Sequence, residues 1–319
     1  MRLRRAAVPL LLLLAAADSL YAQRTPPERQ PIGRRELERA QDELAARKGR
    51  EAARLMLRDA RLREAVHDFQ KNDFRVAPLH FVYGDFVTAT GEPFVAMHFA
   101  ADLPADVTKA TLFGIIDDGA KELWSIEEPV ALQRTADGAA YFEQSFWLPG
   151  SGNATFGFAV KGEPVAMTSE PLQLRTLDKT TRGLSRLLLS KQVFPLDRMQ
   201  AADDPFAFGG IKVVPKADRT FRKSDEVWIF FEARNPGVDA AGAPKLTTSI
   251  TIEGNGKVRK GLAGDAQPMA LKGVKGHFGV GTTVDVSKLT PGEYLLRVSV
   301  EDAVAQQHYE LLEKFSIAD

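Results

Sequence analysis

Residues 289–301 read LTPGEYLLRVSVE, a tight turn followed by a strand. Pro291 and Gly292 form the turn, and after it Tyr294 begins an alternation of apolar and mostly polar side chains. A period of two places the apolar side chains on one face of a β-strand. In β-sandwiches a buried tyrosine often starts a late strand, where its hydroxyl bonds back to the preceding connection. The stretch therefore predicts a β-sandwich in which Tyr294, Pro291 and Gly292 are structural residues.

A related pattern occurs earlier in the chain. Pro149 and Gly150 precede a second alternating run, which contains Phe156. Matching apolar positions recur at three similar separations. Phe156 and Val160 lie 138 residues before Tyr294 and Val298; Val95, Met97 and Phe99 lie 132 before Val227, Ile229 and Phe231; and Leu112 and Ile116 lie 134 before Leu246 and Ile250. Loops absorb length differences that strands cannot, so a small drift in separation is typical of internal repeats. We interpret the chain as mainly β, with two tandem immunoglobulin-like β-sandwiches; chance agreement between short strand patterns is the alternative.

Residues 1–22 have the composition of an export signal peptide. Three arginines precede an almost wholly apolar run at residues 6–17, and Ala22 offers a small residue for cleavage. The run is shorter than the roughly 20 residues that a helix needs to cross a bilayer. We therefore expect a bacterial protein that is exported, either periplasmic or secreted, and has no membrane span after signal removal. An uncleaved anchor is the alternative.

The next two segments are a Pro-rich tether at residues 23–33 and a charged amphipathic helix or helix pair at residues 34–72. Gly49 lies near the middle of the helical segment. Glycine inside a helix costs about 1 kcal/mol, so either one long helix bears that cost or two shorter helices meet there. The apolar stripe departs from a strict heptad, which favours packing on the first sandwich or loose self-association through residues 34–72 over a coiled coil.

Strand and turn patterns divide the remaining chain into three parts. These are β-sandwich 1 at residues 76–176, a linker at residues 177–204 and β-sandwich 2 at residues 205–319. The linker contains an apolar set, here called the linker cluster, that consists of Leu184, Leu187, Leu188, Leu189, Val193 and Phe194. We interpret the linker cluster as a strand or short helix that packs between the two sandwiches.

The last third of the chain resembles a known kind of module. Pro205 and Phe206, the strand at residues 227–232 and the turn and strand at residues 291–298 carry the resemblance. They are similar to the immunoglobulin-like C-terminal modules of secreted bacterial proteins of the GWxTD group. The Gly-Trp-x-Thr-Asp motif itself does not occur in the sequence. The resemblance therefore implies the fold of that module and nothing further.

Composition and motifs indicate no catalytic, cofactor-binding or metal-binding residues. Lys and Arg together number 42, as do Asp and Glu, so no net charge favours binding to nucleic acid. The absence of Cys excludes thiol catalysis and disulfides. The G-x-S-x-G, HExxH and P-loop motifs are also missing. The histidines are not spaced as paired ligands on one helix face, and we expect them on the surface; they are His67, His80, His98, His277 and His308.

Trp228 and Phe230 are the interface candidates of the second sandwich. If the odd-numbered residues of the strand at 227–231 face the core, alternation places Trp228 and Phe230 on the opposite face. Monomeric domains usually cover such an aromatic patch. The linker cluster, with Leu188 and Phe194 as interface candidates, is the nearest cover in the sequence. An unidentified protein partner is the competing cover.

The exported all-β plan and the missing catalytic motifs together indicate a non-enzymatic binding or structural module. We expect it to make protein-protein contacts in the periplasm or outside the cell. The alternative is an accessory protein that recognises a glycan or a peptidase through loops at one end of a sandwich. Acidic and aromatic side chains clustered around Asp117, Trp124 and Asp203 would favour that alternative.

The export prediction is tested by mass. Protein recovered from the extracytoplasmic fraction should have an intact mass that begins at Gln23, because the signal peptidase cleaves after a small residue. A mass that retains residues 1–22 would indicate an uncleaved anchor instead.

Overall fold

A computed structural model describes residues 34–88, 92–178, 180–196, 204–208, 210–260, 267–271 and 276–318. The predicted signal peptide and the Pro-rich tether lie outside the described residues. The chain divides into two compact units, residues 1–50 and residues 51–319. None of the helices in the described ranges is long and apolar enough to cross a membrane.

The predicted helical segment contains two helices, α2 (Arg34–Leu55) and α3 (Ala60–Gln70). The break does not fall at Gly49, which lies inside α2. It falls at residues 56–59 because that connection bonds to strand side chains: the Leu57 amide donates to Ser125 Oγ, and the Arg58 amide donates to Glu127 at 2.7 Å. The position of the break is therefore set by tertiary contacts, and helix propensity along the segment does not reveal it.

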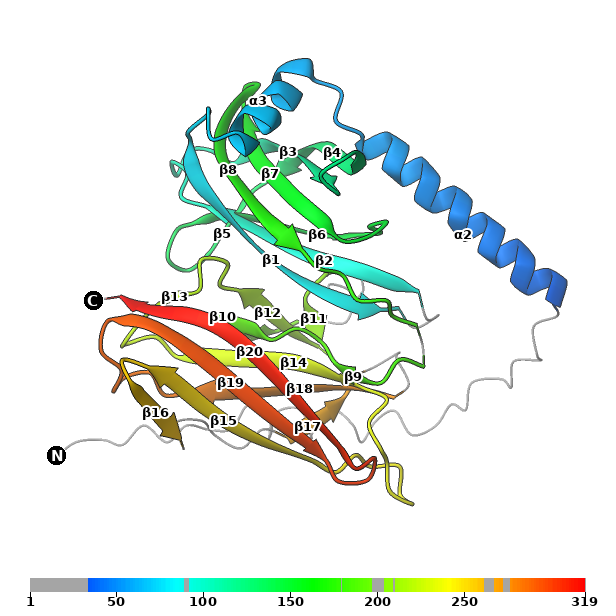
Figure 1. Cartoon of the computed structure of the whole chain (residues 1–319), viewed down its shortest axis with the longest axis vertical. Helices are drawn as coiled ribbons and strands as arrows, with labels where there is room; N and C mark the ends of the chain where they lie inside the picture. The colour runs from blue at the N-terminus through cyan, green and yellow to red at the C-terminus, as the bar shows by residue number, and fades with distance from the viewer. Residues whose placement is uncertain are drawn as a thin grey trace. The chain divides into compact units, whose positions relative to one another are not determined.

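The described chain is mainly β, as the sequence predicts. Its first half contains β1 (Ala77–Val87), β2 (Pro93–Ala101), β3 (Lys109–Asp117), β4 (Glu122–Ala131), β5 (Gln133–Arg134), β6 (Ala140–Phe146), β7 (Gly152–Val160) and β8 (Glu163–Leu172). These strands form one sheet in the order β4-β3-β7-β8-β1-β2-β6-β5. Strand β1 pairs antiparallel with β2 and, through its first two residues, parallel with β8. The sheet is strongly curled (Figure 1). It surrounds an apolar core, in which the Phe81 ring on β1 lies 5.5 Å from the Phe156 ring on β7.

The second half contains two sheets. Its strands are β9 (Gly183–Leu184), β10 (Leu188–Pro195), β11 (Ala207–Phe208), β12 (Ile211–Pro215), β13 (Thr220–Arg222), β14 (Val227–Arg234), β15 (Leu246–Gly254), β16 (Lys257–Lys260), β17 (Gln267–Ala270), β18 (His277–Val284), β19 (Gly292–Asp302) and β20 (Gln307–Ala318). One sheet has the order β11-β12-β10-β14-β18-β17, with β9 also paired to β14, and the other has the order β13-β20-β19-β15-β16. Alternate residues of β14 and β19 fill the core between the sheets.

Strand order is the same in the two halves. The series β4-β3-β7-β8-β1 corresponds to β16-β15-β19-β20-β13, and the series β1-β2-β6-β5 corresponds to β10-β14-β18-β17. The parallel pairing of β1 with β8 has its counterpart in the parallel pairing of β13 with β20. The role of β1 is thus divided in the second half between β10 and β13, which lie in different sheets.

Strand pairing corrects one of the predicted separations. Phe158 on β7 and Leu296 on β19 differ by 138 residues, and their partners across the ladder are Leu112 and Ile252, which differ by 140. The separation of 134 predicted for this strand, which matched Leu112 with Leu246, is therefore wrong. The error of six residues is even, and an even slip keeps every apolar side chain on the same face, so alternation alone does not detect it.

Corresponding glycines make room for an aromatic ring in each half. Gly114 on β3 lies opposite Phe156, and a Cβ atom added to it would lie 2.4 Å from that ring. A Cβ atom added to Gly254, at the end of β15, would lie 2.3 Å from the ring of Tyr294. Since real Cβ atoms do not approach a ring this closely, each glycine is required by the ring beside it.

Tyr294 lies at the start of β19, with its ring buried against Phe315 at 5.5 Å. Its hydroxyl donates to the carbonyl of Thr290 at 2.7 Å, on the upstream side of Pro291. The Asn255 amide donates to the same hydroxyl at 3.0 Å. The phenol therefore joins the turn before β19 to the turn after β15.

Replacement of Tyr294 by Phe should lower the free energy of unfolding by about 1 kcal/mol, because it removes hydrogen bonds and keeps the ring. Urea denaturation of the folded variant measures the change. Tyr309→Phe is the matched control, since no described residue bonds to the Tyr309 hydroxyl, and it should leave the midpoint nearly unchanged. Equal midpoints for Tyr294→Phe and the wild type would contradict the role of the hydroxyl.

Candidate functional site

The two halves meet through a continuous apolar cluster, here called the interdomain layer. It joins the outer face of β1, β2 and β6 to the outer face of β10, β12 and β14, which lie next to each other in Figure 1. Its buried members are Val82, Phe86, Ala96, Ala100 and Tyr141 from the first half and Leu188, Phe206, Phe208, Val213, Val214, Ala217 and Phe230 from the second. The two halves belong to one compact unit, residues 51–319, and the layer lies between them.

Two of the predicted interface residues lie together in this layer. Leu188 on β10 is the ladder partner of Phe230 on β14, and both side chains are buried. The Phe230 ring lies 4.2 Å from the Phe208 ring. It is accommodated by two glycines of β18, because a Cβ atom at Gly279 or Gly281 would lie 2.8 or 3.1 Å from it. Phe230 is therefore buried in the interdomain layer beside Leu188, from the segment predicted as a linker, and beside Phe208 of β11.

The other two predicted interface residues lie outside the apolar cluster. Trp228 is half-buried opposite Ser190, and Phe194 near the end of β10 is 37 % exposed. The segment predicted as a linker contributes β9 and β10 to the sheet of the second half. Its apolar residues are thus divided between the core of the second half and the interdomain layer.

A buried charged network crosses the layer at Glu143 of β6. One carboxylate oxygen lies 2.8 Å from His98 Nδ1, and the other accepts from the ammonium group of Lys212 on β12. Lys212 also donates to Asp204 at 2.6 Å. His98 is 0 % exposed, which corrects the prediction of a surface histidine. Each charged group of this network therefore has a partner, and two of these groups, Lys212 and Asp204, belong to the second half.

Burial alone would raise the pKa of Glu143, but the hydrogen bonds and charges of His98 and Lys212 outweigh it and leave the pKa below its usual value. Burial also raises the pKa of the neighbouring Tyr141 to about 12, assisted by the carboxylates of Glu143 and Asp204. The carboxylate of Glu143 is therefore held in its charged form between the two halves.

A second network lies around Asp85 of β1. The guanidinium of Arg175 binds both carboxylate oxygens of Asp85, one of them at 2.5 Å. Arg234 of β14 donates to the backbone carbonyl of Asp85 and lies 3.3 Å from Glu232, which in turn contacts His277. His277 is buried as well, so the prediction of a surface position is wrong for it too. Arg234 therefore carries this network across the interdomain layer, together with Arg175, which also donates to the Leu184 carbonyl, and Arg186, whose Nε lies 3.9 Å from Asp85.

A third contact lies at the rim of the layer. Asp137 of the first half is 3.0 Å from Lys191 and 3.1 Å from Lys216 of the second half. Burial would raise the pKa of Asp137, but hydrogen bonds from Thr135 and from the two lysines outweigh it and leave the pKa far below its usual range. Removal of one partner from such a partly buried pair leaves a charge without compensation, so these contacts fix the relative position of the halves.

Sequence reasoning missed these networks. His98 lies between Met97 and Phe99, which are core residues of the first half, so alternation does place it on the opposite face. Nothing local shows that this face is buried, because its cover comes from Lys212 and Phe206, more than 100 residues away. The available sequence signal for a buried polar network was the presence of His98 in an otherwise apolar strand.

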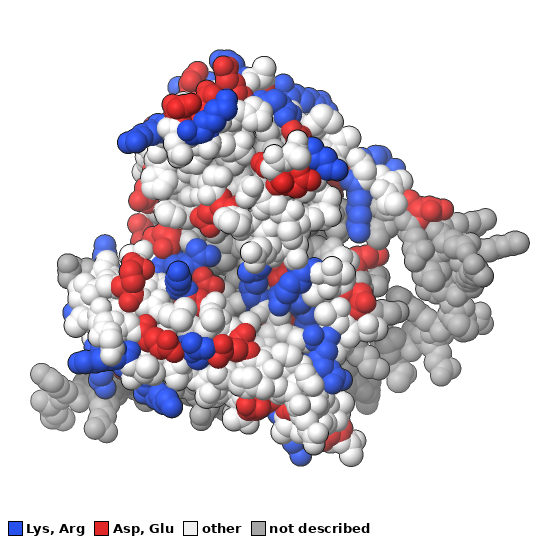
Figure 2. Space-filling view, in the orientation of Figure 1, with Lys and Arg blue, Asp and Glu red and all other residues white. Residues whose placement is uncertain are grey.

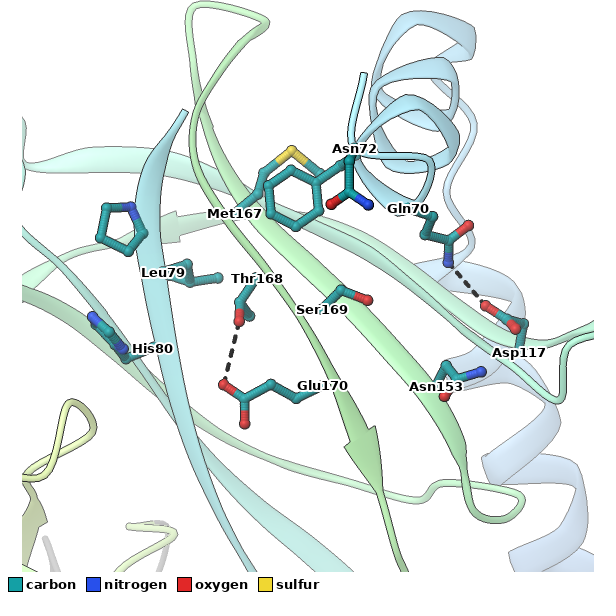
Figure 3. Close-up of a pocket in the computed structure, with 12 residues that line it drawn as sticks. Gln70, Asn72, Leu79, His80, Asp117, Asn153, Met167, Thr168, Ser169 and Glu170 are labelled. Carbon is teal, nitrogen blue, oxygen red and sulfur yellow. Dashed lines mark hydrogen bonds between the residues drawn. The ribbon is translucent and has the colours of Figure 1, made fainter. Parts of the chain in front are cut away.

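A polar hollow of about 660 Å³ lies between the end of α3 and strands β1, β7 and β8 (Figure 3). Gln70, Asn72, Asp117, Asn153 and Glu170 are among the residues that line it. Trp124 does not belong to it, since its ring packs in the core of the first half, 5.4 Å from Phe146. Asp203 lies outside the described residues. The acidic and aromatic cluster that would favour loop recognition is therefore not formed by Asp117 with Trp124.

No group of three or more His, Asp or Glu side chains in the described ranges is arranged to hold a metal ion. No protein-family model matches the sequence, and a comparison with curated proteins found no match.

Leu188→Asp tests the interdomain layer. A carboxylate placed there should lower the free energy of unfolding by about 3 kcal/mol or more, because the site offers it no partner. Hydrogen-exchange mass spectrometry in urea reports both halves separately, and we expect one shared transition in the wild type and two in the variant.

The matched control is Leu312→Asp, because Leu312 on β20 is 49 % exposed and lies outside the layer. This control should change stability by no more than about 0.5 kcal/mol. A shared transition with an unchanged midpoint in Leu188→Asp would contradict the interdomain role of Leu188.

Proposed function

We propose that the chain is a non-enzymatic exported protein in which two immunoglobulin-like β-sandwiches act as one rigid binding or structural module. It makes protein-protein contacts in the periplasm or outside the cell. The observation that carries the proposal is the joint between the halves, where apolar packing and three charged contacts are combined. A joint of this kind suits a protein whose partner contacts both halves in a fixed arrangement.

The charged groups in the joint support a structural role for it. Glu143, Asp85 and Glu232 are the kind of buried carboxylates that enzymes use, yet each binds a cation or a histidine of the same joint. Catalysis needs such groups to converge on a position that a substrate can occupy. Here they converge on one another, which favours a module over an enzyme.

The outer face of the sheet β13-β20-β19-β15-β16 supports contact with polar surfaces. Acidic and basic side chains alternate over β15, β19 and β20 in Figure 2. Arg297 on β19 binds Glu253 on β15 at 3.0 Å and Glu310 on β20 at 2.6 Å. Exposed pairs of this kind contribute little to stability, so they remain available to a partner.

Capture from the exported fraction tests this proposal. The chain from Gln23 serves as bait in its wild-type form, as Leu188→Asp and as Val238→Asp, which is the control because Val238 is 46 % exposed in the connection between β14 and β15. We expect a protein that the wild type retains and Leu188→Asp loses, because the variant breaks the joint and leaves the outer faces unchanged. Equal retention of that protein by the wild type and by Leu188→Asp would contradict a rigid two-sandwich module. Hydrolysis of a captured component by the bait would contradict a non-enzymatic role.

A further inference from the structure

We infer that the polar hollow beside α3 is a binding site for a neutral oligosaccharide, a second ligand of the proposed module in addition to its protein partner. The hollow is built from four strands of the first half, β1, β3, β7 and β8, and from the end of α3, so its walls belong to one compact unit. Its volume of about 660 Å³ lies within the range of about 300–1,000 Å³ that is typical of small-ligand sites.

The side chains of one wall are held in place before any ligand binds. Gln70 at the end of α3 donates to Asp117 at 2.9 Å and to Thr155 at 3.1 Å. The Thr155 hydroxyl is fully buried and lies 2.9 Å from Ser169 Oγ. This chain of four residues from α3, β3, β7 and β8 fixes the polar groups relative to one another, which lowers the entropy lost on binding.

Other polar groups around the hollow have unused hydrogen-bonding capacity. The side-chain amides of Asn72 and Asn153 are exposed and bond to no described residue, and Figure 3 shows them on two sides of the hollow. Among the described residues, the Glu170 side chain bonds only to Thr168, at 3.4 Å. An amide offers both donors and acceptors and a carboxylate offers acceptors, and this combination suits hydroxyl groups, which both donate and accept.

The charge of the hollow favours a neutral ligand. No Lys or Arg is among the described residues that line it, so an anionic ligand would meet Asp117 and Glu170 without a compensating cation. Asp117 already accepts from Gln70 and from the Gly119 amide, which reduces its attraction for a cation. The half-buried ring of Phe69 and the exposed ring of Pro78 add apolar area to the lining, against which the C–H groups of a sugar ring can pack.

Nuclear magnetic resonance titration of the chain from Gln23 tests the site. The neutral probes are maltotetraose, cellotetraose and tetra-N-acetylchitotetraose, and tetragalacturonate is the anionic probe. Deacetylated chitotetraose is the cationic probe, with the same skeleton as one of the neutral probes. We expect at least one neutral probe to shift the side-chain amide resonances of Asn72, Asn153 and Gln70 at concentrations up to about 20 mM.

Variants locate the binding. Asn153→Ala and Glu170→Ala should each weaken binding of that probe by about tenfold, because each loses a hydrogen bond to the ligand. The control is Glu163→Ala on the same strand as Glu170, since the Glu163 side chain is 76 % exposed and lies outside the hollow. It should bind as the wild type does.

Three results would overturn the inference: no shift of these amides with any neutral probe, equal or tighter binding of the cationic or anionic probe, or binding that neither variant weakens. Each would leave the protein-binding proposal intact if capture by the wild type still depends on Leu188.

Discussion

The arrangement of the two halves depends on the burial of one face from each. Apolar side chains supply the area. Glu143 and Asp137 bind lysines of the opposite half, and Arg234 of the second half donates to the backbone carbonyl of Asp85. Burial of an ion without a partner is far more costly than burial of apolar area is favourable. This arrangement of the halves gives the carboxylates of Glu143 and Asp137 their lysine partners, and Phe230 and Leu188 belong to the apolar cluster between the halves.

Equivalent positions in the two halves explain why the helical segment covers only one of them. Phe113 and Ala159 on the outer face of the first half are buried under α3. With the separations of 140 and 138 residues set by strand pairing, their equivalents are Glu253 and Arg297, which bind each other on the open face of the second half. Apolar side chains require a cover and charged ones require water, so a shared strand order has produced one covered face and one solvated face.

Helix α3 thus has two roles in the first half. Leu62 and Val66 cover the apolar outer face, and the next turn brings Gln70 to Asp117 and Thr155. The Asp59 side chain begins this helix by accepting from the Arg61 amide. The polar hollow is consequently a result of how the helix ends above the sheet, and it lies on the first half, away from the charged contacts that join the halves.

The sequence by itself determined the mainly β fold, because alternation such as that at residues 292–302 depends only on neighbouring residues. It also determined the setting of Tyr294, since the turn, the ring and the bond to Thr290 lie within five residues. Only the tertiary structure decided the burial of His98 and His277, the register of β15 and the break between α2 and α3. Each of these rests on contacts between residues far apart in the chain, and a periodic pattern shows which face is apolar without showing what will cover it.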